Sequence, residues 1–130
     1  MTVYCDTSAV LKLVVREAES DALLTYLAAA TATVTSALCL AEVPRVLRRT
    51  SLSRQEVESA LTGLYLIEVT RPILAQAGWI SSDRIGTLDA IHLTSALSMG
   101  LADLAFISYD DGVVAAARAA RLRVVQPGLP

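Results

Sequence analysis

The sequence is poor in the residues that build metal clusters and disulfide frameworks. It contains only two cysteines and one histidine. Cys5 and Cys39 both lie in apolar surroundings, without CxxC spacing or a nearby histidine, so we interpret them as small buried side chains. Charged residues make up 18% of the chain and hydrophobic residues 54%, a composition that excludes intrinsic disorder.

We also expect no secretory leader. No basic segment followed by an apolar one opens the chain, and Asp6 falls where the apolar part of a leader would begin. Residues 22–41 carry no charge and are numerous enough to span a bilayer, but their middle, TATVTS, alternates hydroxyl with apolar residues. That alternation is typical of a strand and unsuited to a lipid-facing helix. We therefore expect a cytoplasmic protein with no membrane partner.

The chain has apolar character in excess of what a small soluble monomer needs. Its 130 residues suffice for one sizeable core and are too few for two, so we expect a single domain over residues 1–130. The mean hydropathy is +0.52. We interpret this value as a sign that part of the apolar surface is covered by a partner.

Strand and helix patterns alternate along the chain. Short apolar and β-branched runs predict five strands, at residues 3–5, 31–35, 65–69, 104–108 and 122–126. Helical spacing of apolar residues predicts helices between them, at 9–15, 17–30, 37–49, 53–64, from Pro72 onward, 88–100 and 111–120. Repeated β–α units predict an α/β fold, a single three-layer α/β/α domain with a five-stranded parallel sheet.

Capping signals support several of these helices. Ser53 followed by Glu56 is a capping box, Ser36 and Thr87 are candidate N-caps, and Pro72 suits the first turn of a helix. Pro44 lies inside a predicted helix and implies a kink or a late start there.

Four acidic residues from distant parts of the chain are placed by this topology at one edge of the sheet. Right-handed crossovers bring the carboxyl ends of parallel strands to the same edge, where α/β proteins bind their ligands. Each acid either follows a strand or lies in the first part of a helix that begins at that edge: Asp6, Glu42, Asp89 and Asp110, with Asp111 beside the last.

Taken singly, most of these acids have a structural explanation. Asp6, Asp89 and Asp110 could cap or complement the N-termini of helices. Glu42 is different because it lies among apolar residues, where an unpaired carboxylate is unfavourable. Independent caps have no reason to converge, and two charges about 4 Å apart repel by ~4 kcal/mol at a surface-like dielectric. The joint pattern therefore favours a bound cation.

Oxygen ligands without a cysteine and histidine set favour Mg²⁺ or Mn²⁺. A cation held by carboxylates accepts phosphate oxygens and best supports phosphodiester hydrolysis. Three hydroxyls lie beside the acids and could orient them, although ordinary turn or cap roles are an alternative for each: Thr7, Ser8 and Ser108.

Four sequence blocks together resemble a PIN domain, and within that family the VapC-like toxins of toxin–antitoxin pairs. They are VYCDTSAVLKL, LAEVPRVL, LDAIHLTSAL and FISYDDGVVAAA, in the family's order and spacing. The resemblance implies a Mg²⁺- or Mn²⁺-dependent ribonuclease whose acidic site is Asp6, Glu42, Asp89 and Asp110. It assigns the hydroxyl positions to Thr7 or Ser8 and to Ser108, and it makes Asp111 the weaker candidate. Pro44, two residues after Glu42, departs from the pattern.

The resemblance also implies partners. VapC-like proteins usually form homodimers, and a small VapB-like antitoxin holds them inactive by packing an apolar helix on the toxin's early helices. The high hydropathy is consistent with such a partner. A PIN domain that serves only as a scaffold, or an RNA-processing nuclease without an antitoxin, are the alternatives.

Several basic residues accompany the acids and are candidates for RNA phosphate contacts, with a solvated helix face as the alternative for each: Lys12, Arg45, Arg49 and Arg84. Only 5% of residues are aromatic, so base stacking is not expected to be the main contact with RNA.

His92 follows Asp89 by three residues. It could donate a proton to the leaving oxygen, but a buried, hydrogen-bonded histidine is the favoured interpretation.

Two other phosphate-related folds fit less well. A receiver-type phosphoacceptor needs an aspartate after the third strand and a late lysine, and no lysine follows Lys12. A haloacid-dehalogenase-like phosphatase needs a D-x-D pair, and Ser8 stands where the second aspartate would be.

Overall fold

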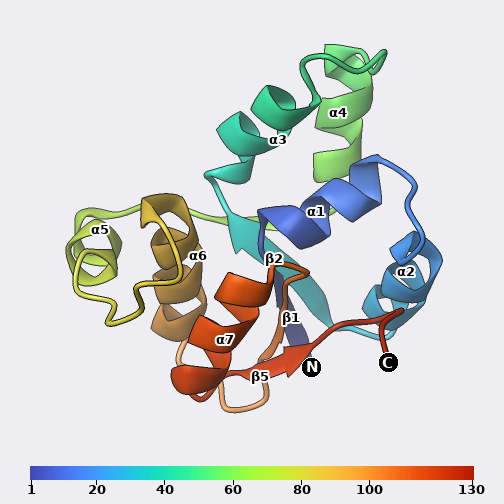
Figure 1. Ribbon diagram of the computed structural model, residues 1–130. Helices are drawn as coiled ribbons and strands as arrows, with labels where there is room; N and C mark the ends of the chain where they lie inside the picture. The colour runs from blue at the N-terminus through green and yellow to red at the C-terminus, as the bar shows by residue number, and fades with distance from the viewer.

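Five short strands form one parallel sheet at the centre of the computed structural model, which describes residues 1–130. The order across the sheet is β3-β2-β1-β4-β5, so the chain adds strands to one side of β1 and then to the other (Figure 1). The predicted five-stranded parallel sheet is confirmed. Its strands are β1 Thr2–Cys5, β2 Ala32–Ser36, β3 Tyr65–Ile67, β4 Ala105–Ile107 and β5 Arg123–Val125.

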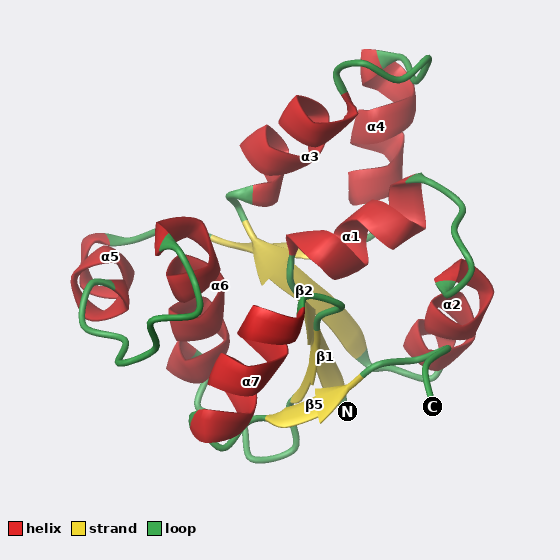
Figure 2. Cartoon of the chain, in the orientation of Figure 1, coloured by secondary structure: helices red, strands yellow, loops and turns green.

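Seven helices flank the sheet. Helices α1 to α4 gather on one side, while α6 and α7 lie on the other and α5 packs against α6 (Figures 1 and 2). Their bounds are α1 Thr7–Val14, α2 Ser20–Ala28, α3 Cys39–Leu47, α4 Arg54–Leu61, α5 Arg71–Ala77, α6 Thr87–Ser98 and α7 Asp111–Ala119. None of them has the length and apolar character that crossing a bilayer requires.

The central strand divides the core into two layers because successive side chains point to opposite faces of a sheet. Val3 and Cys5 pack into the cluster under α1 to α4, and Tyr4 packs into the cluster under α6 and α7. The Tyr4 ring stacks on Phe106 of the neighbouring strand at a centroid distance of 5.5 Å. A strand buried on both faces explains why residues 3–5 carry no alternation of polar and apolar side chains.

The helix ends confirm some capping predictions and correct others. Ser53 accepts a hydrogen bond from the amide of Glu56, as the capping box predicts, and Pro72 lies in the first turn of α5. Thr87 as an N-cap is wrong, because α6 begins at Thr87 and the cap position is Gly86, without a side-chain bond. No side chain caps this helix, and it begins one residue earlier than predicted.

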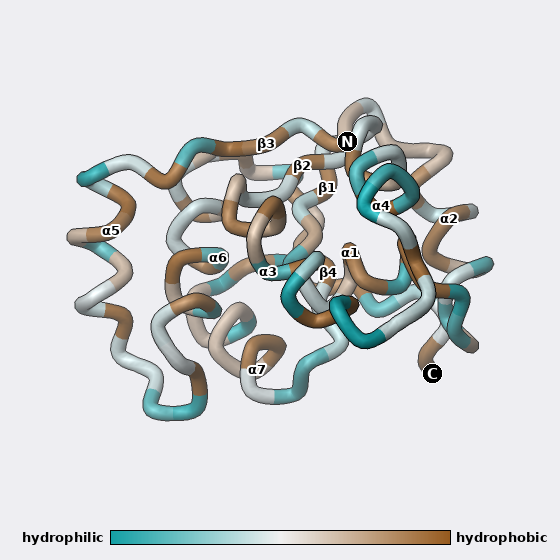
Figure 3. Tube along the Cα trace, turned by 90° about the horizontal axis from the view of Figure 1, so that it is seen from above, coloured by the Kyte–Doolittle hydropathy of each residue, from teal (hydrophilic) through white to brown (hydrophobic).

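The proline in α3 does not break the helix. The helix begins at Cys39, later than the sequence predicts, and Pro44 remains inside it. Leu40 and Pro44 are both exposed, so the carbonyl that loses its usual donor lies on the solvent side. Viewed from above, the outer turns of neighbouring α4 are largely hydrophilic (Figure 3).

Candidate active site

The site lies where the strand order changes direction. Strands β1 and β4 are neighbours in the sheet, and the connections from them run to opposite sides. Asp6 follows β1 and Asp110 stands three residues after β4, while the Asp6 amide donates to the Ile107 carbonyl at 3.1 Å. Such a switch point is where open α/β sheets leave a crevice for ligands.

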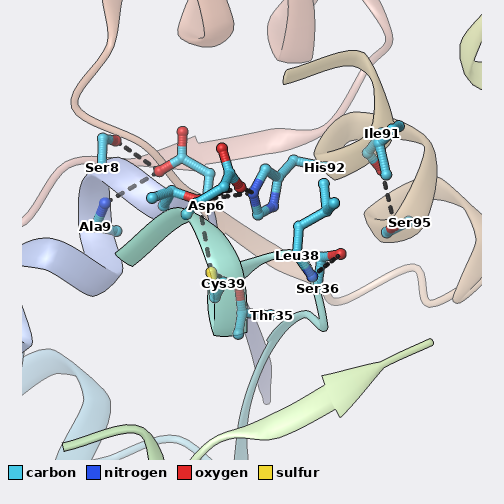
Figure 4. Close-up of polar contacts among 12 residues, drawn as sticks. Asp6, Ser8, Ala9, Thr35, Ser36, Leu38, Cys39, Ile91, His92 and Ser95 are labelled. Atoms are coloured by element: carbon cyan, nitrogen blue, oxygen red, sulfur yellow. Dashed lines mark hydrogen bonds and ion pairs between the residues drawn. The ribbon is translucent and has the colours of Figure 1, made fainter. Parts of the chain in front are cut away.

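Asp6 is buried at the start of α1, with 2% of its surface exposed. Its Oδ1 accepts hydrogen bonds from the Ala9 amide at 3.1 Å and from the Ser8 hydroxyl at 2.6 Å (Figure 4). Burial raises the pKa of Asp6, and the hydroxyls of Ser108 and Ser8 partly oppose this rise. The acid therefore caps a helix and is also held in a poorly solvated position.

Two serine hydroxyls connect the ends of β1 and β4. Ser8 Oγ lies 3.3 Å from Ser108 Oγ and accepts the Tyr109 amide at 2.9 Å. Ser108 Oγ accepts the Asp110 amide at 3.1 Å. These contacts tie the loop before α7 to the first turn of α1, so Asp6 and Asp110 are held on one framework.

Asp110 is an exposed N-cap. Its Oδ1 accepts the Val113 amide at 3.0 Å, as expected for an aspartate at a helix start. A Cβ on Gly112 would lie 2.8 Å from the carbonyl oxygen of Arg84, which is closer than a side chain tolerates. The absence of a side chain at Gly112 thus lets the segment before α6 approach the start of α7.

Glu42 projects from the first turn of α3 and is bound by two other segments. Its Oε1 accepts the Thr7 hydroxyl at 2.7 Å and lies 2.8 Å from His92 Nε2. Burial favours a higher pKa for Glu42, but the hydrogen bonds from His92 and Thr7 outweigh it and the pKa lies below its ordinary value. Glu42 is therefore stabilised as a carboxylate, in contrast to Asp6 and Asp89, whose pKa values are raised.

His92 is a residue of the candidate site whose contacts the sequence predicts only in part. It is buried and hydrogen-bonded, as the favoured interpretation predicts, and Figure 4 shows its ring turned toward the space around Asp6. One hydrogen-bond partner of His92 is Glu42, a candidate metal ligand. The sequence did not predict this pairing. The three-residue spacing from Asp89 places both side chains on one helix face and indicates that His92 lies near the acids, but it does not indicate which acid His92 contacts.

Asp89 links the four acids electrostatically. Burial raises its pKa, and the charges of Asp110 and Asp6, and more weakly that of Glu42, raise it further. Repulsion of this kind indicates that the carboxylates lie near one another. Four sequence-distant acids are thus brought within electrostatic reach of each other.

Three of the four acids keep a carboxylate oxygen that makes no hydrogen bond within the chain. Asp6, Glu42 and Asp110 each use one carboxylate oxygen in hydrogen bonds within the chain and leave the other without such a bond. Oxygen ligands of this type suit Mg²⁺ and Mn²⁺. Glu42 also belongs to a second group of potential ligands. One ligand atom each of Cys39, Glu42 and His92 lie within 4.8 Å of one another.

The predicted basic residues separate into two groups. Lys12 Nζ lies 2.9 Å from a Glu19 oxygen and 4.8 Å from the centre of the Tyr109 ring, and its side chain is only 12% exposed. Its charge is thus engaged within the chain, which argues against the predicted phosphate contact. The remaining three are exposed and form no ion pair within the chain: Arg45, Arg49 and Arg84.

Comparison with known proteins identifies the family of the chain. The family model described as the PIN domain matches residues 3–122. Ribonuclease VapC46 of Mycobacterium tuberculosis is 40% identical over 126 residues, which cover 96% of this chain and 97% of the relative. Ribonuclease VapC47 of the same species is 32% identical over 132 residues, 97% of each chain.

Solved structures share the fold at low sequence identity. The crystal structure of Mycobacterium tuberculosis VapC20, a Sarcin-Ricin loop cleaving toxin, has a TM-score of 0.71 at 22% identity, covering 88% of this chain and 94% of that one. VapBC2 of Rickettsia felis, bound to a promoter DNA fragment, has a TM-score of 0.70 at 14% identity, covering 98% and 99%. The chain therefore belongs to the PIN domain family and, within it, to the VapC-like group.

Proposed function

We propose that the protein is a Mg²⁺- or Mn²⁺-dependent endoribonuclease and acts as the toxin of a toxin–antitoxin pair. The curated relatives at 32–40% identity are named ribonucleases. The observation that carries the metal dependence is the set of contacts that gathers Asp6, Glu42 and Asp110 from three different helix starts and leaves each with one oxygen free of hydrogen bonds. A cluster of this kind is relieved by a cation.

Each of the four acids has a defined part in this proposal. Asp6, Glu42, Asp89 and Asp110 would hold the cation through the oxygens that make no bond within the chain. When bound, such a cation lowers the pKa of a water and neutralises charge on the reacting phosphate. Ser8 and Ser108 keep Asp6 and the start of α7 in place, and Thr7 holds one oxygen of Glu42.

Arginines outside the acidic cluster would hold the substrate. Arg45 and Arg49 lie one turn apart at the end of α3, and Arg84 lies beside the start of α7. Exposed arginines flanking an acidic site can pair with the phosphates on either side of the scissile bond. Lys12 is left out of this set because Glu19 already engages it.

A cleavage assay tests the nuclease. Purified protein with Mg²⁺ or Mn²⁺ should cut RNA to products with a 5′-phosphate and a 3′-hydroxyl, and chelation should stop the reaction. Asp6→Asn should reduce the rate by more than about 100-fold while near-native circular dichroism is retained. Asp111→Asn, a neighbouring exposed acid outside the proposed set, is the matched control and should cleave normally. Wild-type activity in Asp6→Asn would refute the assignment.

The antitoxin half of the proposal is supported by a groove between α3 and α4. It has a volume of about 600 Å³ and is lined mainly by Leu40, Leu47, Leu52, Val57 and Leu61. An apolar groove between two helices accepts the apolar face of a third.

The product of a short adjacent gene should copurify with this protein and inhibit its cleavage of RNA. Active protein without such a partner would favour a stand-alone nuclease. The predicted homodimer is tested by light scattering on the same samples.

A further inference from the structure

A buried hydrogen-bond chain runs from the core of the sheet to Glu42. Tyr4 of β1 contacts His92 Nδ1 at 2.8 Å, and His92 Nε2 contacts Glu42 Oε1 at 2.8 Å. Thr7 Oγ1 completes a triangle, 2.7 Å from Glu42 Oε1 and 2.8 Å from His92 Nε2. Tyr4 and His92 are both at most 1% exposed.

The triangle can be satisfied in only one way when Glu42 is ionised. A carboxylate oxygen carries no hydrogen, so both contacts to Oε1 must be donated to it. Thr7 has a single hydroxyl hydrogen, and that hydrogen is directed to Glu42. The contact from His92 therefore requires a hydrogen on Nε2. A bare Nε2 would place a lone pair against the carboxylate oxygen at 2.8 Å.

The other ring nitrogen is set by Tyr4. Burial raises the pKa of Tyr4 above its ordinary value, so the phenol keeps its hydrogen and can donate it. A neutral imidazole with a hydrogen on Nε2 offers a free lone pair on Nδ1 to that donor. Both ring nitrogens of His92 and the hydroxyls of Tyr4 and Thr7 then have partners, and the ring cannot turn over without losing both of its contacts.

We propose that His92 is a positioning residue, which Tyr4 fixes as the Nε2–H tautomer. Together with Thr7, His92 occupies one oxygen of Glu42 and leaves the other oxygen for the divalent cation. This inference rests on the proposed function, because it assigns Glu42 to the cation. The carboxylate would otherwise rotate freely about its last bond, and a ligand held in one orientation binds a cation more tightly.

The single histidine makes the tautomer directly observable. Long-range ¹H–¹⁵N spectra of metal-free, [¹⁵N]histidine-labelled protein contain signals from His92 alone, because the chain has no other histidine. We expect the Nε2–H pattern, and we expect Tyr4→Phe to shift the Nδ1 signal by removing its donor. An Nδ1–H or doubly protonated pattern in the wild-type protein would overturn the proposal.

Cation affinity tests the positioning role without relying on cleavage. Titration calorimetry with Mn²⁺ should show that His92→Leu binds about 10-fold more weakly or worse, the scale on which residues that orient metal ligands act. His92→Gln, whose amide can still donate to Glu42, should recover much of that loss. Thr94→Val is the matched control, since Thr94 lies buried on the same helix and its hydroxyl has no partner; its Mn²⁺ affinity should equal that of the wild type.

The outcomes separate this inference from the proposed function. If the wild-type protein does not bind Mn²⁺, the metal-dependent function fails, whatever the tautomer. If the wild type binds and His92→Leu binds equally well, the function stands and the positioning role is refuted. Should His92→Leu fail to fold, Tyr4→Phe gives the comparison, because it removes the donor that fixes the tautomer. Weaker Mn²⁺ binding by Tyr4→Phe would support the positioning role, and wild-type affinity would refute it.

Discussion

Asp89 is in conflict with its surroundings as long as no cation is present. Burial and the charges of Asp110 and Asp6 raise its pKa, which means that the folded chain holds the ionised form less favourably than the unfolded chain does. Active sites often contain groups that are destabilising for the fold and necessary for the chemistry. Asp89 is therefore expected to show opposite effects on stability and on activity.

Replacing Asp89 with Asn should separate the two effects. The neutral amide removes the repulsion, so we expect the metal-free variant to melt a few degrees above the wild type in scanning calorimetry near neutral pH. The same variant should lose RNA cleavage. Asp111→Asn is the control, because it removes an equal charge outside the proposed set. A lower melting temperature for Asp89→Asn would mean that the carboxylate has a stabilising partner.

At the scale of elements, one glycine controls how closely two helix starts approach each other. Gly112 in the first turn of α7 lies against the segment that leads into α6. Asp89 and Asp110 come from these two helices, so their separation depends on this contact.

We expect Gly112→Ala to disturb both the packing and the site. The new Cβ would meet a backbone oxygen at 2.8 Å, and backbone moves less easily than the end of a side chain. The free energy of unfolding should fall by about 1–3 kcal/mol, the range typical of overpacking, and cleavage should fall with it. Chemical denaturation measures the first effect. Gly63→Ala is the control, since nothing lies within 4 Å of its Cβ position; similar stabilities of the two variants would disprove the close approach.

At the scale of the whole molecule, the acids couple folding to pH and to cations. The pKa values of Asp6 and Asp89 are raised from the ordinary 3.8, so the unfolded chain loses these protons first and stability falls as the pH rises through the raised values. Glu42, with a pKa lowered from 4.5, acts in the opposite sense, because its contribution is lost as the pH falls below that value.

A divalent cation should reverse the loss at higher pH, because it competes with protons for the same oxygens. We expect the rise in melting temperature caused by Mg²⁺ or Mn²⁺ to be larger at pH 7 than at pH 5, as measured by differential scanning fluorimetry. In Asp6→Asn this dependence on cations should be much reduced. An equal shift at both pH values would indicate that the cation binds elsewhere.

The sequence by itself determined the order of elements, the parallel sheet and the edge at which the acids meet. Strand and helix periodicities are local, and the handedness of β–α–β connections is nearly invariant, so these features follow without knowledge of packing. Asp6 and Asp110 could be placed beside each other on this basis alone, although 104 positions of the chain separate them. Exact helix starts were less accessible: α6 begins at Thr87, one residue earlier than predicted, and α3 begins at Cys39, two residues later than predicted.

Only the tertiary structure decided which side chains contact each other within that edge. The pairing of His92 with Glu42, the capture of Lys12 by Glu19 and the close approach at Gly112 all depend on the relative depth and rotation of packed helices. Those quantities are set by the summed volumes of many core side chains, so no spacing in the sequence encodes them. For the same reason, the contact between Glu42 and His92 could be identified only from the packed arrangement of α3, α6 and β1.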